Sequence, residues 1–494
     1  MKFDWLTQGW SHFALAIGIL AVVVDFVVRV LSVIFVPRNR RPQTATAWLL
    51  AIFFLPYIGI LLFWLIGSRY LPKKRRDKQH EINNYILGTT EGMDLVRVDK
   101  TWPSWLPSVV ALNRNLGAMP MVGGNRATLH DDYDESLIAM TTALQTAKRY
   151  IHAEFYILNL DKTTRPFFDE LAAAVDRGVT VRVLLDHIAC LRSKNYRETL
   201  RRLTQMGADW NLMLPVQPLK GKFQRPDLRN HRKILIIDGE VGFTGSQNVI
   251  DASYDKRGNI KRGLRWKDLM VRFEGPIVAG INALFVTDWY SETDELLVRE
   301  VEGITHDRAG DLLDAQVVPS GPGFDGENNL RLFNSLIYAA KKQVIITSPY
   351  FVPDESMLYA ITTAAQSGLD VQLFVSEIGD QAVTYHAQRS YYEQLLRAGV
   401  RIWLYRAPTI LHAKHITIDD QVAVIGLSNM DMRSFSLDLE ITVMVKGSKF
   451  VQSLRRVEDS YRTRSRELTL AEWMQRPSRS KVLDNIARLT AAVQ

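Results

Sequence analysis

Two copies of one short motif hold the residues of this 494-residue chain whose types and spacing could do chemistry. The frame His-x-Lys-x-x-x-x-Asp occurs as His231, Lys233 and Asp238, and again as His412, Lys414 and Asp419. In each copy an Asn follows seventeen residues after the His, at Asn248 and Asn429. A three-residue frame can arise once by chance, but a matched repeat of this kind is much rarer. Chance is therefore a poor explanation.

Two imidazoles and two ammonium groups can transfer a phosphodiester without a metal. One His attacks phosphorus and the other protonates the leaving alkoxide, while the Lys and Asn groups hold the non-bridging oxygens. A lone His in a strand is more often a half-buried structural residue, and we keep that interpretation for His415, which lies outside the frame. The repeat favours catalysis for His231 and His412. Neither motif has paired Cys or His spacing typical of zinc, so we expect no metal and no other cofactor.

The residues around each motif predict a buried strand, a turn and a second strand. An apolar, β-branched run separates the Lys from the Asp, and a glycine, Gly245 or Gly426, precedes the Asn by three residues. Alternate side chains of a strand share a face, so the His and Lys of one copy should point the same way. The Asp lies at an odd spacing from the His. We therefore expect Asp238 and Asp419 mainly to hold the local structure.

The remainder of the chain predicts an α/β fold with two fused lobes, each a mixed sheet flanked by helices, preceded by a helical membrane hairpin. Helical and β-branched runs alternate through residues 119–300 and 301–494, which we assign to the first and second lobe. The second lobe includes a charged, helix-like tail after Lys446. We assign residues 1–70 to a membrane anchor and residues 71–118 to a basic juxtamembrane linker.

The membrane anchor is expected to contain two spans. Residues 47–66 carry no charge and are long enough to cross a bilayer, with Pro56 tolerated inside the helix. Residues 13–36 are also long enough, and their charges, Asp25 and Arg29, could pair at i, i+4 spacing. An interfacial helix is the alternative for this first segment, which is too long for a cleaved signal peptide.

Basic residues outnumber acidic ones, and the formal net charge is +8. This excess fits either nucleic acid or an anionic membrane surface. Basic residues follow the second span at Arg69, Lys73, Lys74, Arg75, Arg76 and Lys78, and a smaller group lies between the spans at Arg38, Arg40 and Arg41. The heavier flank predicts that everything after Ile66 is cytoplasmic and that this cluster attracts anionic headgroups. The single cysteine, Cys190, rules out an intrachain disulfide.

Several longer stretches resemble the phospholipase D superfamily and, within it, the bacterial cardiolipin synthases. The likeness extends from the membrane segment to about residue 445 and follows the order AWLLAIFFLPYIGILLFWLIG, HAEFYIL, GVTVRVLLDHIA, RWKDLMVRFEGP, SGP, SPYFVPDESM and LHAKHITIDDQVAVIGLSNMDMRS. No short motif alone separates a synthase from another superfamily member, but the ordered series does so much better.

The resemblance implies a role for each matching residue. The catalytic histidines of the family fall on His231 and His412, its phosphate-binding lysines on Lys233 and Lys414, and its motif asparagines on Asn248 and Asn429. An acidic residue downstream of each motif orients the catalytic His in the family, and the matching positions are Asp268 and Glu440. The family usually has Ser or Thr after the motif glycine, which is Ser246 in the first copy but Leu427 in the second. On this basis the first half-site is better equipped to hold phosphate, and His231 is expected to be the nucleophile.

The resemblance also implies a multi-pass enzyme of the bacterial cell membrane that acts on phosphatidylglycerol among anionic lipids. It would move a phosphatidyl group from one phosphatidylglycerol to another, giving cardiolipin and glycerol. The alternatives are a phospholipase D or other phosphatidyltransferase that uses water or another alcohol, a superfamily nuclease, and a lipid-binding scaffold. The membrane hairpin disfavours a nucleic acid partner, and two intact motifs disfavour a scaffold. A homo-oligomer is left open.

Overall fold

The computed structural model describes residues 4–38, 40–68, 70–91, 102–297, 312–324 and 326–490. The chain forms two compact units, Met1–Arg69 and Tyr70–Gln494. The expected boundary between the two lobes, at residue 300, lies outside the described residues.

The N-terminal unit consists of the helices α1 (Asp4–Phe35), α2 (Pro42–Phe54) and α3 (Pro56–Ile66). Within α1, the 21 residues Leu15–Phe35 are long and apolar enough to cross a membrane. The expected i, i+4 ion pair forms there, with Arg29 Nε 2.7 Å from Asp25 Oδ2. The pair lets two charges share an otherwise apolar helix.

The uninterrupted helix expected for residues 47–66 is not formed, because the helix breaks at Leu55 and restarts at Pro56. Proline has no backbone N–H and disfavours helical geometry in the residue before it, and Leu55 has φ −134° and ψ 70°. The rings of Trp48 and Phe63 lie 5.5 Å apart, edge to face. A continuous helix would separate these residues by roughly 22 Å. The two helices therefore fold against one another.

Gly59 is what lets α2 and α3 approach so closely. A Cβ on Gly59 would lie 2.7 Å from the backbone oxygen of Ala51, and also 2.7 Å from the Cα of Ile52. The two helices have 13 and 11 residues, and a membrane-spanning helix needs about 20. Neither is long enough to cross a bilayer.

The large unit is built on one mixed sheet of 16 strands. Its first half contains β1 (Met121–His130), β2 (Tyr150–Phe155), β3 (Thr180–Asp186), β4 (Asp209–Met213), β7 (Arg229–Asn230), β8 (Lys233–Ile237), β9 (Val241–Gly245) and β11 (Met270–Glu274). Its second half contains β12 (Leu313–Ser320), β13 (Gln343–Thr347), β15 (Asp370–Ser376), β16 (Arg401–Tyr405), β18 (His415–Ile418), β19 (Val422–Gly426), β21 (Asp438–Lys446) and β22 (Ser465–Leu468). The mixed sheet expected from the sequence is confirmed.

The two halves repeat one pairing pattern. In the first, β2, β3 and β4 are parallel neighbours, and β2, β8, β9, β11 and β1 follow one another antiparallel. In the second, β13, β15 and β16 are parallel, and β13, β18, β19, β21 and β12 are antiparallel. The halves join where β1 pairs with β12. Corresponding strands thus place the two motifs in equivalent positions.

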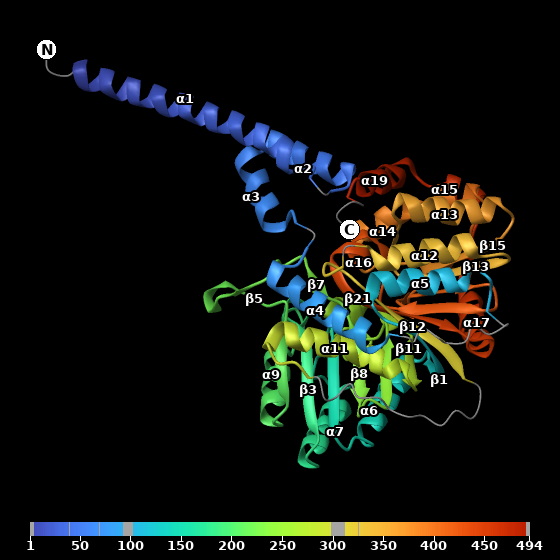
Figure 1. Ribbon diagram of the computed structural model, residues 1–494. Coiled ribbons are helices and arrows are strands. Elements are labelled where there is room, and N and C mark those ends of the chain that lie inside the picture. The colour runs from blue at the N-terminus through green and yellow to red at the C-terminus, as the bar shows by residue number, and fades with distance from the viewer. Residues whose placement is uncertain are drawn as a thin grey trace. The chain divides into compact units, whose positions relative to one another are not determined.

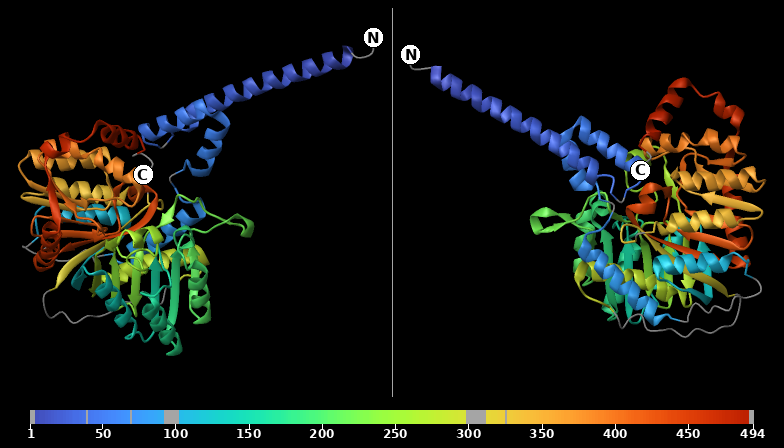
Figure 2. Two further views of the ribbon diagram at one scale, coloured as in Figure 1. Left: turned by 180° about the vertical axis from the view of Figure 1, so that it is seen from behind. Right: turned by 45° about the horizontal axis from the view of Figure 1, so that its top comes forward.

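Helices cover both faces of the sheet (Figure 1), and Figure 2 shows the same layers from two other directions. One cluster of apolar side chains lies under α6 (Tyr133–Leu144) and α7 (Arg165–Asp176), and another under α12 (Asn328–Ala339) and α13 (Glu355–Gln366). A central cluster joins both halves of the sheet to α11 (Ile277–Thr293) and α17 (Ser448–Thr463). Every motif strand is therefore packed on both faces, which explains its continuous apolar run.

The stretch expected to be a linker contains α4 (Lys73–Thr89) and α5 (Leu106–Gly117), both packed on the large unit. Arg75 lies 2.7 Å from Glu292, and Lys78 lies 2.6 Å from Asp294. The side chains of Arg75 and Lys78 are only 11% and 9% exposed. These two cations hold α4 to α11, so they are engaged within the large unit, and the expected attraction of headgroups would fall to other members of the cluster such as Lys74, which is 77% exposed.

We predict that Trp48→Cys combined with Phe63→Cys will be bridged by a short bismaleimide in membranes, because the folded helix pair brings these side chains into contact. Mass spectrometry of the peptide should show one reagent bound through both ends. The matched control is Leu15→Cys with Val30→Cys, which has the same separation along the uninterrupted helix α1. Two separately modified thiols in the Trp48/Phe63 variant, as in the control, would contradict the folded pair.

Candidate active site

Each motif His lies just before a buried strand, in the connection that leads into it. His231 separates β7 from β8, and His412 follows β17 (Thr409–Leu411) and precedes β18. Each Lys turns back to its own His, with Lys233 Nζ donating to His231 O at 2.8 Å and Lys414 Nζ to His412 O at 2.6 Å. His and Lys stay together in each copy, as expected, although the His is not on the regular strand.

The two motif histidines are held by carboxylates. His231 Nδ1 lies 3.1 Å from Glu440 Oε1, and His412 Nδ1 lies 2.7 Å from Asp268 Oδ1. Both carboxylates are fully buried. Since each Nδ1 is occupied, the Nε2 atoms are left for substrate. Each carboxylate was expected to orient the His of its own copy, but each one contacts the His of the other copy.

The crossed pairing follows from two strand pairs that join the copies. β10 (Arg265–Lys267) pairs with β17, and His412 N donates to Lys267 O at 2.7 Å, so the next residue, Asp268, reaches the second His. β7 pairs with β21, and His231 N donates to Leu439 O at 3.0 Å, which places Glu440 at the first His. Neither half-site is complete without the other half of the chain.

Burial sets the charge of the groups in the site. It lowers the pKa of His231 well below its usual value, with help from Lys233, and it lowers the pKa of Lys233 to about 8 and of Lys414 to about 7. The charges of Lys414 and His412 also lower the pKa of His231, and Lys233 lowers that of His412. All four motif groups therefore share one electrostatic environment.

The two carboxylates differ in charge. Burial raises the pKa of Glu440 to about 8. Burial acts the same way on Asp268, but His412, Lys414 and a hydrogen bond from Ser246 outweigh it and lower the pKa of Asp268. Burial and Lys414 also lower the pKa of His412, while Asp268 counteracts them. His412 thus faces an ionised carboxylate that stabilises an imidazolium, whereas the His231–Glu440 pair shifts toward its neutral form.

The motif aspartates hold turns, as the sequence analysis expected. Asp238 accepts the backbone N–H groups of Lys148, Arg149 and Tyr150, each at 2.8 Å. Asp419 accepts those of residues 341–343. Both aspartates have a positive φ, 54° and 50°, in the turn that follows the motif strand. Their carboxylates fix the end of the strand opposite the His.

Ser246 does not stand ready to hold phosphate. Its side chain is 1% exposed, its Oγ accepts from Leu269 N at 2.9 Å, and it hydrogen-bonds Asp268. The hydroxyl expected to be absent from the second copy is supplied by Ser434, which hydrogen-bonds Glu440 and accepts from Asn429 N at 3.1 Å. The expectation that the first half-site holds phosphate better, because it has Ser246 where the second has Leu427, is therefore wrong.

The two motif asparagines are placed differently. Asn248 Oδ1 accepts from Ile157 N at 3.0 Å, and its Nδ2 donates to Tyr254 Oη at 2.9 Å. Asn429 is 8% exposed, and within the described part of the chain its Oδ1 has no hydrogen-bond partner. Asn248 fixes the first-half loop, while Asn429 keeps polar capacity for a ligand.

Two tyrosines beside the histidines, and an arginine paired with Asp438, whose charge acts on His231, were not predicted from the sequence. The ring of Tyr156 stands edge-on to His231 at 4.8 Å, and the ring of Tyr350 edge-on to His412 at 6.3 Å. Arg433 lies 3.1 Å from Asp438 and donates to Asp227 O at 2.6 Å. The available signal was that each tyrosine follows a corresponding strand: Tyr156 comes directly after β2, and Tyr350 is three residues after Thr347, the last residue of β13. Over the described ranges, no group of three or more His, Cys, Asp or Glu is arranged to hold a metal ion.

Comparisons with known proteins agree with this arrangement. A family model described as "Cardiolipin synthase, PLD-like domain" matches residues 140–274 and 333–460, and one described as "Phospholipase_D-nuclease N-terminal" matches residues 26–68. Cardiolipin synthase A of Proteus mirabilis (strain HI4320) is 32% identical over 91% of this chain and 92% of that protein. Cardiolipin synthase A of Wigglesworthia glossinidia brevipalpis is 31% identical over 95% and 94%.

Among solved structures, phosphatidylserine synthase from Haemophilus influenzae Rd KW20 is similar in fold. Its TM-score is 0.60 at 14% identity, and the match covers 78% of this chain and 99% of that one. Paired half-sites on a large mixed sheet define a phospholipase D-like protein. More closely, the chain belongs to the cardiolipin synthase family of phospholipase D-like proteins. As a member of that family it is a phosphatidyltransferase.

We predict that Asp268→Asn will lower phosphatidyl transfer about 10²–10⁴-fold, because the amide cannot stabilise an imidazolium on His412. The loss should shrink as the pH falls, since His412 then takes its proton from solvent without the carboxylate. Rates measured from acid to alkaline pH test this. Asp134→Asn, at a carboxylate 57% exposed in a surface ion pair, is the control. A pH-independent loss would indicate that Asp268 only supports the fold.

Proposed function

We propose that this protein synthesises cardiolipin by moving a phosphatidyl group from one phosphatidylglycerol to a hydroxyl of the glycerol headgroup of another, with release of glycerol. The observation that carries the proposal is the crossed pair of buried His–carboxylate contacts, with one motif Lys bound to each His backbone. Family membership supplies the substrate class.

In the first step, Nε2 of a neutral His231 attacks phosphorus, and a protonated His412 gives its proton to the departing glycerol oxygen. The products are a phosphatidyl group on His231 and free glycerol. In the second step, the now neutral His412 takes the proton from a hydroxyl of the second phosphatidylglycerol, whose oxygen attacks phosphorus. The bond from phosphorus to His231 breaks, and both histidines return to their starting states.

The charge asymmetry of the site supports this division of labour. Burial favours a neutral His231, as a nucleophile requires, and the ionised Asp268 supports protonated His412, as an acid requires. Lys233 and Lys414 would hold the non-bridging oxygens, and a bound phosphodiester would keep both of them protonated. The unpaired Oδ1 of Asn429 is an acceptor, so it would take a hydrogen bond from a headgroup hydroxyl.

Acid-quenched single turnovers with labelled phosphatidylglycerol test the proposal. We expect label on the peptide containing His231, none in His231→Ala, and slow accumulation in His412→Ala, because that variant lacks only the proton donor and acceptor. Steady-state assays should give equal amounts of diphosphatidylglycerol and glycerol. Label on the His412 peptide alone would reverse the assignment, and phosphatidate as the main product would identify a hydrolase instead.

The large unit is proposed to comprise two fused lobes, residues 119–300 and 301–494, whose matching strand order supports an origin by repetition. The lobes share one sheet and one site. The shared sheet explains why the crossed contacts can be held at hydrogen-bond distances.

We propose that the catalytic unit is cytoplasmic and that, among the residues that the structure describes, α1 alone spans the membrane. Because α2 and α3 fold against one another, the chain can enter the membrane and leave it again on the same side. The basic groups at residues 38–41 and 73–78 then lie on one side, whereas a second span would separate them. The folded pair therefore satisfies the positive-inside rule better than two spans do.

Labelling of introduced cysteines in intact cells with an impermeant reagent tests this topology. We expect Gln8→Cys to react, and Gln43→Cys and His80→Cys to react only after the cells are opened. Native Cys190 is buried, so the protein without an introduced cysteine gives the background level of labelling. Labelling of Gln43→Cys but not Gln8→Cys in intact cells would restore the two-span topology.

A further inference from the structure

The C-terminal helix α19 (Ser478–Arg488) leaves an unusual amount of apolar surface uncovered. Val482, Leu483, Ile486 and the adjoining Leu489 are 54%, 51%, 58% and 83% exposed. Their spacing places them along one stripe of the helix. Single exposed aliphatic residues are common on soluble proteins, but four within eight positions of one helix form a contact surface.

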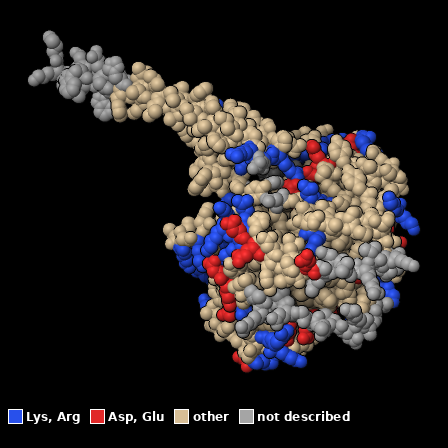
Figure 3. Space-filling view, in the orientation of Figure 1, with Lys and Arg blue, Asp and Glu red and all other residues tan. Residues whose placement is uncertain are grey.

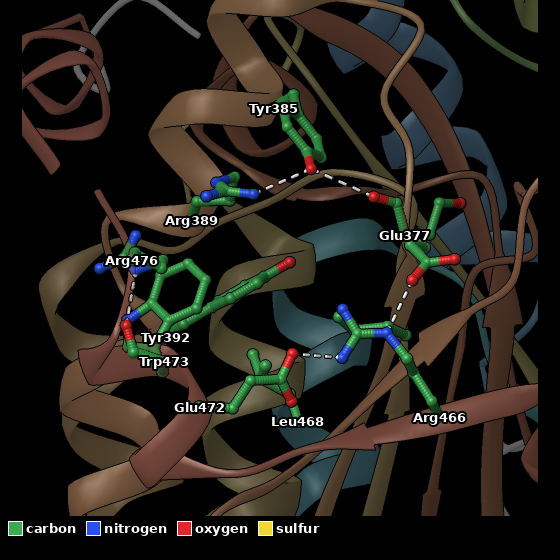
Figure 4. A pocket seen from close by; sticks show the side chains of 11 residues that line it. Glu377, Tyr385, Arg389, Tyr392, Arg466, Leu468, Glu472, Trp473 and Arg476 are labelled. Atoms are coloured by element: carbon green, nitrogen blue, oxygen red, sulfur yellow. Dashed lines mark hydrogen bonds and ion pairs between the residues drawn. The ribbon is translucent and has the colours of Figure 1, made fainter. Parts of the chain in front are cut away.

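The opposite face of α19 is fixed to the large unit. Asp484 Oδ1 lies 2.7 Å from His386 Nδ1 and 3.3 Å from Arg389 Nε, and its Oδ2 lies 2.5 Å from Arg476. Arg389 and Arg476 line a cavity of about 180 Å³ with Tyr385, Trp473 and Glu377 (Figure 4). The buried Asp484 therefore orients the helix, and the apolar stripe faces outward.

A second exposed apolar feature is the hairpin formed by β5 (Val216–Gln217) and β6 (Lys222–Phe223). At its tip Leu219 is 102% exposed, and Phe223 is 48% exposed. The base is held firmly, because Arg229 donates to the carbonyl oxygens of Leu214 and Arg225 at 3.1 and 3.0 Å. The corresponding connection in the second half, between β16 and β17, is only residues 406–408. The hairpin is an addition to the first half alone.

Both features carry positive charge. The hairpin has Lys220 and Lys222 beside its apolar tip and no acidic residue between 214 and 224, and basic side chains gather at this part of the surface (Figure 3). On α19 the cations are Arg479, Lys481 and Arg488, and the one carboxylate, Asp484, is already bound on the inner face. Aliphatic side chains flanked by cations fit the interface of an anionic bilayer.

The two features are connected to opposite halves of the site. The hairpin leads to Asp227, whose carbonyl accepts from Arg433, and then to His231. Helix α19 packs on α14 (Ala382–Arg389), next to Asp380, whose carboxylate accepts from Tyr350 Oη at 2.9 and 3.0 Å. In Figure 1, β7 and β21 are labelled near the middle of the large unit, with the hairpin strand β5 to one side of them and α19 above.

We propose that Leu219, Phe223, Val482, Leu483, Ile486 and Leu489 form a docking face by which the catalytic unit rests on an anionic bilayer, with the site opening between the two features. The proposal rests on the proposed function, because it supplies a lipid substrate. A docked face would let a headgroup pass from the bilayer to the histidines without full exposure of the acyl chains to water. The N-terminal anchor tethers the chain, whereas the docking face would orient the catalytic unit.

Environment-sensitive fluorophores test the contact. Full-length Leu219→Cys and Ile486→Cys are labelled in proteoliposomes that contain phosphatidylglycerol and a lipid with a nitroxide on its acyl chain. We expect blue-shifted emission and strong quenching at both positions. Tyr359→Cys, at a side chain 64% exposed on α13, should stay unquenched. A shift without lipid quenching would mean that a second copy or another protein segment covers the face, and this would overturn the proposal, as would an aqueous spectrum at both positions.

Turnover separates this inference from the proposed function. Leu219→Gln with Phe223→Gln, and Leu483→Gln with Ile486→Gln, should each lower the rate on phosphatidylglycerol vesicles about tenfold to a hundredfold. Both variants should act normally on short-chain phosphatidylglycerol that stays monomeric, and Tyr359→Gln should be normal on both substrates. Unchanged vesicle rates would refute the docking face. Wild-type protein that turns over neither substrate would refute the proposed function instead.

Discussion

The interaction on which the site depends is the backbone pairing of the two copies through β10 with β17 and β7 with β21. These short parallel pairs carry Asp268 to His412 and Glu440 to His231. A buried carboxylate without a partner is costly, so each one stabilises the pairing only while the opposite half is in place. Folding of the two halves and assembly of the site are thus one event, and a separated half would leave a buried carboxylate and a His without their partners.

Two near-identical half-sites still have to perform different steps. The sheet gives both histidines the same backbone environment, so the difference must come from side chains. Asp268 is stabilised in its charged form by the charge of His412 and a hydrogen bond from it, whereas burial raises the pKa of Glu440 to about 8. A symmetric frame thus carries an asymmetric charge distribution, which supports the proposed roles of His231 as nucleophile and His412 as acid and then base.

The features that depend on the local sequence pattern were predicted from the sequence. Buried runs before Asp238 and Asp419 predicted the motif strands, and the odd spacing predicted that these aspartates hold turns. The contacts of Asp268 with His412 and of Glu440 with His231 could not be predicted. The order of the motifs along the chain does not show which motif copy the residues after a strand will contact. Ser434 was missed since it lies outside the motif frame. Pro56 was taken as tolerable in an apolar helix, but Gly59 lets the next helix pack against the first.

The site is buried, but its lipid substrate starts in the bilayer and has to reach it. The motif His side chains are only 11% and 8% exposed. Burial of the motif lysines lowers their pKa, and it strengthens the attraction between a protonated Lys and a phosphodiester. A diacyl lipid, however, starts in the bilayer, where its phosphate is at the interface. A deep site can use such a substrate only if its opening lies at that interface. The proposed docking face would bring the opening of this buried site to that interface, which an anchor elsewhere in the chain does not do by itself.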